Sequence, residues 1–226
     1  SINSSGISYI DPAKGVMYFY ALTDMNSRTM PGYAVPLVVY ALVIAAIFVM
    51  RLFLPWPYVV SVSALIMLAV PFFLKPESRD LKWHPRGILL GLLVSAVLLA
   101  AYVAVIWGYG HYSGQSLTIN KLSYSFILIQ LLLVALPEEA FFRGYLQHKF
   151  GNSIKSVVIV SAFFAVGHFV TICLGGGHGA GLCAQAILTF FPSLVMGYLY
   201  LATGTLWAGI IFHFLANVVH IAVGLS

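Results

Sequence analysis

Charged side chains are scarce in this sequence. Only 8% of its 226 residues are charged, whereas 61% are hydrophobic, and the mean hydropathy is +0.98. A soluble domain carries about 25% charged residues, so this scarcity excludes an ordinary soluble protein. The apolar runs approach the roughly 20 residues needed to cross hydrocarbon. They lack the period-two alternation of a transmembrane barrel. We therefore expect an integral membrane protein whose spans are helices.

Cysteines are also few, and several common motifs are missing. Cys173 and Cys183 match no zinc-finger spacing. We interpret them as small buried residues at helix ends, with a disulfide as the alternative if their loop faces an oxidising compartment. The glycine-rich stretch between them lacks the Lys-Ser/Thr of a phosphate-binding loop, and no HExxH motif occurs. These absences make nucleotide binding and a HExxH-type zinc protease unexpected.

Seven hydrophobic runs predict seven transmembrane helices. Their expected limits are 33–54, 57–75, 87–109, 122–148, 154–174, 182–202 and 205–225. The sequence PWP at 55–57 predicts a tight turn between the first two. No internal repeat is present, so residues 1–226 are expected to form a single integral membrane domain of the all-α class.

The N-terminal segment, residues 1–32, is of mixed composition. Asp11 followed by Pro12 is typical of the start of a helix. Residues 13–25 are too few to span a bilayer, so we interpret them as an interfacial helix. We do not expect a cleavable signal peptide at the start of this segment.

Lysine and arginine indicate the orientation of the spans, because cytoplasmic loops are enriched in them. Alternation of the spans puts most of these residues on one side: Lys14, Arg28, Lys75, Arg79, Lys82, Arg86, Lys149 and Lys155, with Arg143 nearby. Only Arg51 and Lys121 fall towards the other side. We therefore expect a cytoplasmic N-terminus, an outer C-terminus and outward-facing cysteines, in a prokaryotic inner membrane. Because the net charge of +5 is spread between spans, nucleic-acid binding is not expected.

Ionisable side chains inside a span cost a few kcal/mol unless they have a partner or a function. Glu139 and Arg143 are four residues apart, so they share a helix face and can form an ion pair. Glu138 points about 100° away and has no cation at that spacing. Its partner must therefore come from another helix.

Two histidines from later spans lie at a similar depth. At 1.5 Å per residue, Glu138, His168 and His213 lie roughly 16, 20 and 14 Å from the inner ends of their spans. Asn217 follows His213 by four residues and shares its helix face. We expect these four side chains to form one buried polar site. The other intramembrane or loop histidines are interpreted as structural: His148, His178 and His220.

This set of side chains suits the hydrolysis of an amide. A carboxylate and an imidazole that converge on one water can make it nucleophilic. A His and an Asn on an opposing helix can donate hydrogen bonds to a developing oxyanion. No Ser or Cys has a convincing base partner in the set, so a covalent mechanism is not favoured.

Three motifs carry a resemblance to a known family. EEAFFRGYLQ at 138–147 matches EExxxR, FAVGH at 164–168 matches FxxxH, and HFLAN at 213–217 matches HxxxN. In this order and on separate hydrophobic helices, the motifs resemble those of the CPBP intramembrane proteases. That family includes type II CAAX prenyl endopeptidases and bacteriocin-processing proteins. The resemblance covers roughly residues 120–220, the expected catalytic core.

The resemblance implies a glutamate-dependent endopeptidase without a metal cofactor, acting on a membrane-anchored protein or peptide. It implies that Glu138 is the general base and works with His168 on the attacking water. His213 and Asn217 would stabilise the oxyanion. The supporting residues would be Glu139, Arg143 and Phe164, the last packing beside the site.

Three alternatives remain at this point. Glu138, His168 and His213 could be ligands of zinc, with water as the fourth. The protein could instead be a non-catalytic immunity or partner-binding membrane protein, since the wider family includes such members. Buried Glu, Arg and His also occur in the proton relays of transporters.

Overall fold

A computed structural model describes residues 6–11, 16–21, 31–74, 81–175 and 179–226. The chain separates into two compact units, Ser1–Val35 and Pro36–Ser226. Several residues considered above lie outside the described ranges: Pro12, Lys14, Arg28, Lys75, Arg79 and His178.

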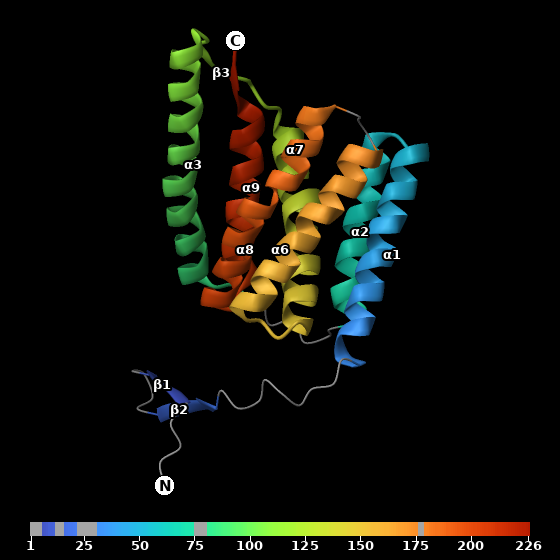
Figure 1. Cartoon of the computed structure of the whole chain (residues 1–226), viewed down its shortest axis with the longest axis vertical. Helices are drawn as coiled ribbons and strands as arrows, with labels where there is room; N and C mark the ends of the chain where they lie inside the picture. Colours follow the sequence, from blue (N-terminus) through green and yellow to red (C-terminus); the bar gives the residue numbers. More distant parts are fainter. Residues whose placement is uncertain (1–5, 12–15, 22–30, 75–80, 176–178) are drawn as a thin grey trace. The chain divides into compact units, whose positions relative to one another are not determined.

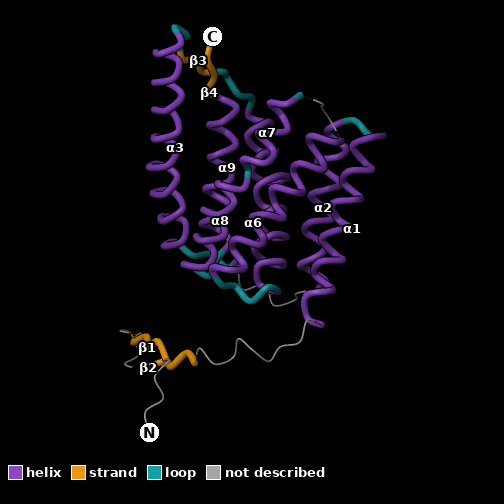
Figure 2. Tube along the Cα trace, in the orientation of Figure 1, coloured by secondary structure: helices purple, strands orange, loops and turns teal. Residues whose placement is uncertain are grey.

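The N-terminal unit contains a two-stranded antiparallel sheet. Strand β1 (Gly6–Asp11) pairs with β2 (Val16–Ala21), drawn as strands in Figure 2. The expected interfacial helix over 13–25 is therefore wrong for residues 16–21, and Asp11 ends a strand instead of starting a helix. Both strands are rich in β-branched and aromatic residues, which favour extended backbone. That preference outweighs the helix-start signal of Asp-Pro.

The second unit is a helical bundle (Figure 1). Its elements are α1 (Pro31–Phe53, which begins in the first unit), α2 (Trp56–Leu74), α3 (Pro85–Ser113), β3 (Leu117–Ile119), α4 (Tyr124–Ile129), η3 (Gln130–Ala135), α5 (Leu136–Glu139), η4 (Ala140–Gln147), α6 (Ile154–His168), η5 (Phe169–Leu174), α7 (Ala180–Leu188), α8 (Phe190–Thr203), α9 (Leu206–Ala222) and β4 (Val223–Leu225). The label η marks π-helical segments, in which each backbone N–H reaches back five residues.

Six helical stretches are long and apolar enough to cross a membrane: Gly32–Phe53, Trp56–Leu74, Pro85–Ser113, Tyr124–Gln147, Ile154–Leu174 and Ala180–Thr203. They match six of the seven predicted spans. A tight turn between the first two is confirmed, but it lies at 54–55, because Trp56 and Pro57 already belong to α2. The seventh predicted span contains α9, a shorter apolar helix of 17 residues. The all-α, multi-pass architecture is confirmed.

The last residues of the seventh predicted span are not helical. β4 pairs antiparallel with β3, and Ile119 lies opposite Val223. Gly224 disfavours continuation of the helix, and the backbone of Val223 is already extended (φ −98°, ψ 126°). The expectation of a helix up to residue 225 is therefore wrong over Val223–Leu225.

Apolar side chains cover the outside of the bundle, whereas several polar ones lie inside. Leu65 is 67% exposed and Val97 69% exposed, but Glu139 and Arg143 are at most 1% exposed. This distribution of polar and apolar side chains is the reverse of that in a soluble protein and suits helices surrounded by lipid. Together with the six long apolar helices, it identifies an integral multi-pass membrane protein.

π-Helical turns precede the two glutamates of the EExxxR segment and contain its arginine. Pro137 has no backbone N–H and cannot continue a regular α-helical ladder. The π-helical segment η3 directly precedes α5, the short turn that carries Pro137 and both glutamates, and η4 follows it. In η3, the N–H of Leu136 donates to the carbonyl oxygen of Leu131. π-Helical turns often occur at functional sites, so the backbone here agrees with the motif.

The two ends of the bundle differ in their side chains. We call the end that carries the α1–α2 turn, β3, β4 and the start of α7 the disulfide end. These elements lie together at the top of Figure 1. The opposite end, with the start of α3, the start of α6 and the α8–α9 turn, is called the basic end. Its described cations are Lys82, Arg86, Lys149 and Lys155.

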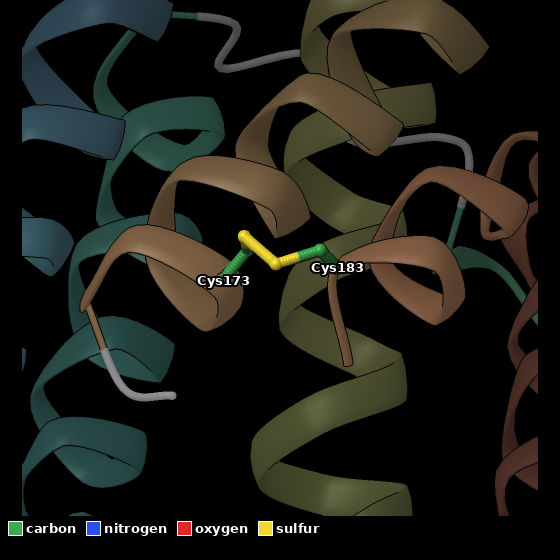
Figure 3. Close-up of a disulfide and its surroundings, with 2 residues drawn as sticks. All are labelled: Cys173 and Cys183. Carbon is green, nitrogen blue, oxygen red and sulfur yellow. A yellow bond between two sulfur atoms is a disulfide. The ribbon is translucent and has the colours of Figure 1, made fainter. Parts of the chain in front are cut away.

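Cys173 in η5 and Cys183 in α7 form a disulfide (Figure 3), with their Cα atoms 4.8 Å apart. The interpretation of two unbonded buried cysteines is therefore wrong, and the alternative of a disulfide is correct. The bond joins two consecutive helical segments at the disulfide end.

Candidate active site

The predicted ion pair between Glu139 and Arg143 is confirmed. Arg143 Nη1 donates to Glu139 Oε1 over 2.9 Å, one helical turn apart. Arg143 Nη2 donates to the carbonyl oxygen of Ser193 (3.0 Å) and to its Oγ (2.7 Å). Because both charged side chains are buried, these bonds replace the water that each group loses. The pair thus joins η4 to α8.

His213 lies between the two adjacent glutamates. Its Nδ1 donates to Glu139 Oε1 over 3.0 Å, since a carboxylate only accepts. Its Nε2 lies 3.7 Å from Glu138 Oε2, a charge-pair distance rather than a hydrogen bond. The partner of Glu138 therefore comes from another helix, α9, as its position on the helix predicted.

His168 is the last residue of α6 and is held by its own turn. Its Nδ1 donates to the carbonyl oxygen of Phe164 over 3.0 Å. In the neutral ring this bond leaves the lone pair on Nε2. Phe164 packs against His168 at 4.3 Å between ring centroids and against His213 at 5.8 Å. The guanidinium carbon of Arg143 lies 5.0 Å from the same ring centroid, so one aromatic side chain contacts three predicted site residues.

Asn217 lies one helical turn beyond His213 on α9. Its Nδ2 donates to Oε1 of Gln130, in η3, over 3.0 Å. Gln130 is buried and was not predicted as a site residue. The available signal was a single carboxamide inside the apolar run FILIQLLLVA, eight residues before Glu138.

Other buried polar contacts were missed by the sequence reasoning. Gln147 Nε2 donates to Asn152 Oδ1 (2.9 Å) and to the carbonyl oxygen of Gly197 (3.0 Å). Ser193, which contacts Arg143, is likewise fully buried. Ser193 and Gln147 hold the helices around the motif residues rather than facing a cavity, and no short motif marks them in the sequence.

A cavity of about 360 Å³ reaches the predicted site. Glu138, His168, Asn217 and Gln130 contribute to its lining. Among the described lining residues, Glu138 is the only carboxylate; His213 is not one of them but lies 3.7 Å from Glu138. The structure therefore brings the four predicted residues together, and three of them line the cavity.

One oxygen of Glu138 has no hydrogen bond. Its Oε2 is buried and has no partner within the described part of the chain. A buried carboxylate oxygen without a donor is costly. This is the oxygen that lies 3.7 Å from Nε2 of His213, so its nearest polar neighbour comes from α9.

The remaining histidines are distributed as follows. Nδ1 of His220 and the hydroxyl of Tyr102, in α3, are 2.8 Å apart. His220 also lines the cavity, towards the disulfide end. His148 is exposed next to η4. Within the described ranges, no three His, Cys, Asp or Glu side chains are arranged to hold a metal ion.

Comparison with known proteins agrees with the motifs. Residues 120–219 match the family model of type II CAAX prenyl endopeptidase Rce1-like proteins. No curated protein and no solved structure matches the chain. The family match supports a CAAX-type intramembrane protease in general. The matched residues hold the whole candidate site, so the part of the chain that carries the three motifs is the part similar to the Rce1-like type II CAAX prenyl endopeptidases.

Proposed function

We propose that the protein is an intramembrane endopeptidase that cleaves a membrane-anchored protein or peptide with a water activated by Glu138. The observation that supports this most directly is the position of Glu138, which lines the cavity together with His168 and is the only carboxylate among the described lining residues. A carboxylate in that position can accept a hydrogen bond from a water and then its proton.

His168 would assist Glu138. Its bond to the Phe164 carbonyl fixes the ring, and its free Nε2 can accept a hydrogen bond from the same water while Glu138 takes the proton. Both side chains line one cavity. A water held between an imidazole nitrogen and a carboxylate has two acceptors and is thus oriented for attack on a carbonyl carbon.

Asn217 is the best-placed donor to the oxyanion. One N–H of its amide is used by Gln130, and the second remains for the substrate. A single such donor contributes about 10²–10³ to kcat in other hydrolases. His213 contacts both glutamates and does not line the cavity, so in this arrangement it holds the two carboxylates. Because its Nδ1 already donates to Glu139, donation to the oxyanion requires a second proton on Nε2.

Glu139 and Arg143 would support the site without contacting the reacting atoms. Glu139 accepts from both Arg143 and His213 through the same oxygen, Oε1. This shared acceptor fixes the His213 ring relative to the helix that carries Glu138. The described part of the site needs no metal for these steps, and we propose a metal-free mechanism. We also propose that the protein lies in a prokaryotic inner membrane with its N-terminus in the cytoplasm.

The test is cleavage of candidate peptides, prenylated and unprenylated, by the purified full chain in detergent or lipid, with products identified by mass spectrometry. We expect Glu138→Gln to abolish cleavage while the unfolding temperature stays close to that of the parent protein. Glu77→Gln, which removes a carboxylate from the sequence between the second and third spans, serves as the matched control and should cleave normally. Cleavage by the Glu138→Gln protein would contradict the mechanism.

A further inference from the structure

His220 is a cavity residue that lies outside the three motifs. It lines the same cavity as Glu138 and Asn217. Because His220 follows Asn217 by three residues, the two side chains are neighbours on one face of α9. At 1.5 Å per residue, His220 lies about 4.5 Å nearer the disulfide end. The polar lining of the cavity therefore continues one helical turn beyond the proposed oxyanion donor.

Tyr102 determines which nitrogen of His220 carries the proton. The hydroxyl of Tyr102 and Nδ1 of His220 are 2.8 Å apart, which is a hydrogen-bond distance. In a neutral imidazole, one nitrogen donates and the other accepts. If Nδ1 donated, the Tyr102 O–H would have no acceptor within the described part of the chain, and such a group is costly in a helix surrounded by lipid. The hydroxyl therefore donates to Nδ1, and the ring proton is on Nε2.

The Nε2–H of His220 lies on the side of the ring that is turned away from α3. The two nitrogens of an imidazole point in nearly opposite directions. Tyr102 belongs to α3, which packs against α9 (Figure 1) and supplies none of the described lining residues. Within the described ranges, no residue accepts a hydrogen bond from Nε2. A ring that lines the cavity and is held from behind by Tyr102 thus keeps one donor for a ligand.

We propose that His220 donates its Nε2–H to a backbone carbonyl of the substrate, two residues from the scissile carbonyl, and that Tyr102 is the positioning residue that keeps the proton on Nε2. This inference rests on the proposed endopeptidase function. Carbonyls on one side of an extended chain are two residues, or about 6.6 Å, apart.

Asn217 and His220 fit this repeat of an extended chain. The Cβ atoms of residues three apart on a helix are about 5–6 Å apart, and the longer histidine side chain increases the separation of the two donors. Both donors recognise a carbonyl oxygen and not a side chain. The ligand class is therefore an unwound, extended peptide segment that is recognised through its backbone.

The position of the proton can be measured without any enzymatic activity. Nitrogen-15 NMR of the full chain, labelled at histidine, separates protonated from unprotonated ring nitrogens. The His220 signals are assigned by their loss in His220→Gln. At mildly alkaline pH we expect a proton on Nε2 and none on Nδ1, and a mixture of both tautomers in Tyr102→Phe. A proton on Nδ1 in the parent protein would overturn the proposal.

A thioamide scan tests the contact with the peptide. The sulphur of a thioamide accepts a weaker hydrogen bond than a carbonyl oxygen, so one thioamide is moved through the peptide residue by residue. Dissociation constants are measured on the full chain carrying Glu138→Gln, so that binding is not accompanied by cleavage. One position, two residues from the bond that the parent protein cleaves, should weaken binding roughly three- to tenfold. The neighbouring position, whose carbonyl points to the other side of the strand, is the matched control.

Variants of His220 and Tyr102 show whether the sensitive carbonyl contacts this pair. His220→Phe keeps a ring without the donor, and in this variant the sensitive thioamide should no longer weaken binding. In kinetics the same change should raise KM roughly three- to tenfold with little change in kcat, because the contact is equal in the ground and transition states. His111→Phe, in the last turn of α3 and outside the described lining, is the control and should retain the KM of the parent protein.

Tyr102→Phe should weaken binding about twofold, because about half of the rings then carry the proton on Nδ1. In the His220→Phe background, Tyr102→Phe should have no further effect on binding. A further loss there would show that Tyr102 supports only the packing of α3 on α9.

The outcomes separate this inference from the endopeptidase function. Cleavage without any thioamide position that depends on His220, or with one at another distance from the cleaved bond, would overturn the backbone contact and leave the endopeptidase. Binding that depends on His220 without cleavage of any peptide would contradict the endopeptidase and leave the backbone contact. Absence of both binding and cleavage would overturn both.

Discussion

His213 and Glu139 are 74 residues apart in the sequence and are joined by a 3.0 Å hydrogen bond from Nδ1 to Oε1. The same oxygen of Glu139 accepts from Arg143. This arrangement determines which nitrogen of His213 carries a proton, and it leaves Nε2 facing Glu138. The second glutamate of the EExxxR motif is therefore the element that couples α9 to the helix bearing the proposed base.

Gly209→Ala tests whether this coupling matters for cleavage. A Cβ at position 209 would lie 2.7 Å from Oε2 of Glu139, so the carboxylate or α9 must move. We expect at least tenfold lower kcat and a loss of about 1–3 kcal/mol in the free energy of unfolding. Gly108→Ala, where a Cβ meets nothing within 4 Å, is the matched control and should keep activity. Equal activity of both variants would show that Glu139 need not keep its position.

Arg143→Met tests the buried ion pair. Removing the guanidinium leaves Glu139 as a buried charge and also removes two bonds to Ser193. Loss of one partner of a buried pair costs about 3–5 kcal/mol. The double change Glu139→Gln with Arg143→Met should be less destabilising than the sum of the single changes. Additive losses in thermal or denaturant unfolding would show that the two side chains do not interact.

Asn217→Ala should lower kcat by about 10²–10³ with little change in KM, because the proposed oxyanion contact exists only in the transition state. Gln130→Ala removes only the partner that orients Asn217, so its loss of kcat should be smaller. The comparison uses steady-state kinetics on one peptide. A larger effect from Gln130→Ala than from Asn217→Ala would reverse the assigned roles.

Treatment with a chelator separates the metal-free mechanism from the zinc alternative. We expect full activity after incubation with EDTA or 1,10-phenanthroline and after dialysis. Purified protein should contain well under one equivalent of zinc by elemental analysis. Loss of activity that returns on addition of zinc would support Glu138, His168 and His213 as metal ligands instead.

Removing the disulfide should lower stability. The Cys173–Cys183 bond closes a loop of about 10 residues, for which chain entropy gives about 2–3 kcal/mol. The double change Cys173→Ser with Cys183→Ser should reduce the free energy of unfolding by this amount, as measured in denaturant with the parent protein under oxidising conditions. An identical unfolding midpoint with and without reductant would show that the bond does not form in the isolated protein.

The polar residues of the site were predictable because buried charge is rare in an apolar sequence. Glu138, His168, His213 and Asn217 each interrupt a hydrophobic helix, and the structure places them together. Their exact pairing was less accessible, because spacing within one helix does not show which residues of separate helices meet. Regular spacing therefore found the Glu139–Arg143 pair but not the contact between Gln130 and Asn217.

Elements with weak periodic signals were the ones missed. The β1–β2 hairpin lies in a segment of mixed composition, where one Asp-Pro signal competed with aromatic strand formers. The β3–β4 pair joins segments more than 100 residues apart, and each strand has only three residues. Such short strands form because a partner is nearby in space, and a single sequence does not show that proximity.

The ion pair within one helical turn has a consequence for biosynthesis. Arg143 can neutralise Glu139 as soon as their shared helix has wound, before the ribosome has made α8 or α9. In the described part of the chain Glu138 forms no ion pair within its own helix, and its contact with His213 forms only after α9 has been made. Loss of the C-terminal 20 residues, which include His213, should therefore impair membrane insertion of this helix. The impairment would come from Glu138 and not from Glu139, because Glu139 keeps its pair with Arg143.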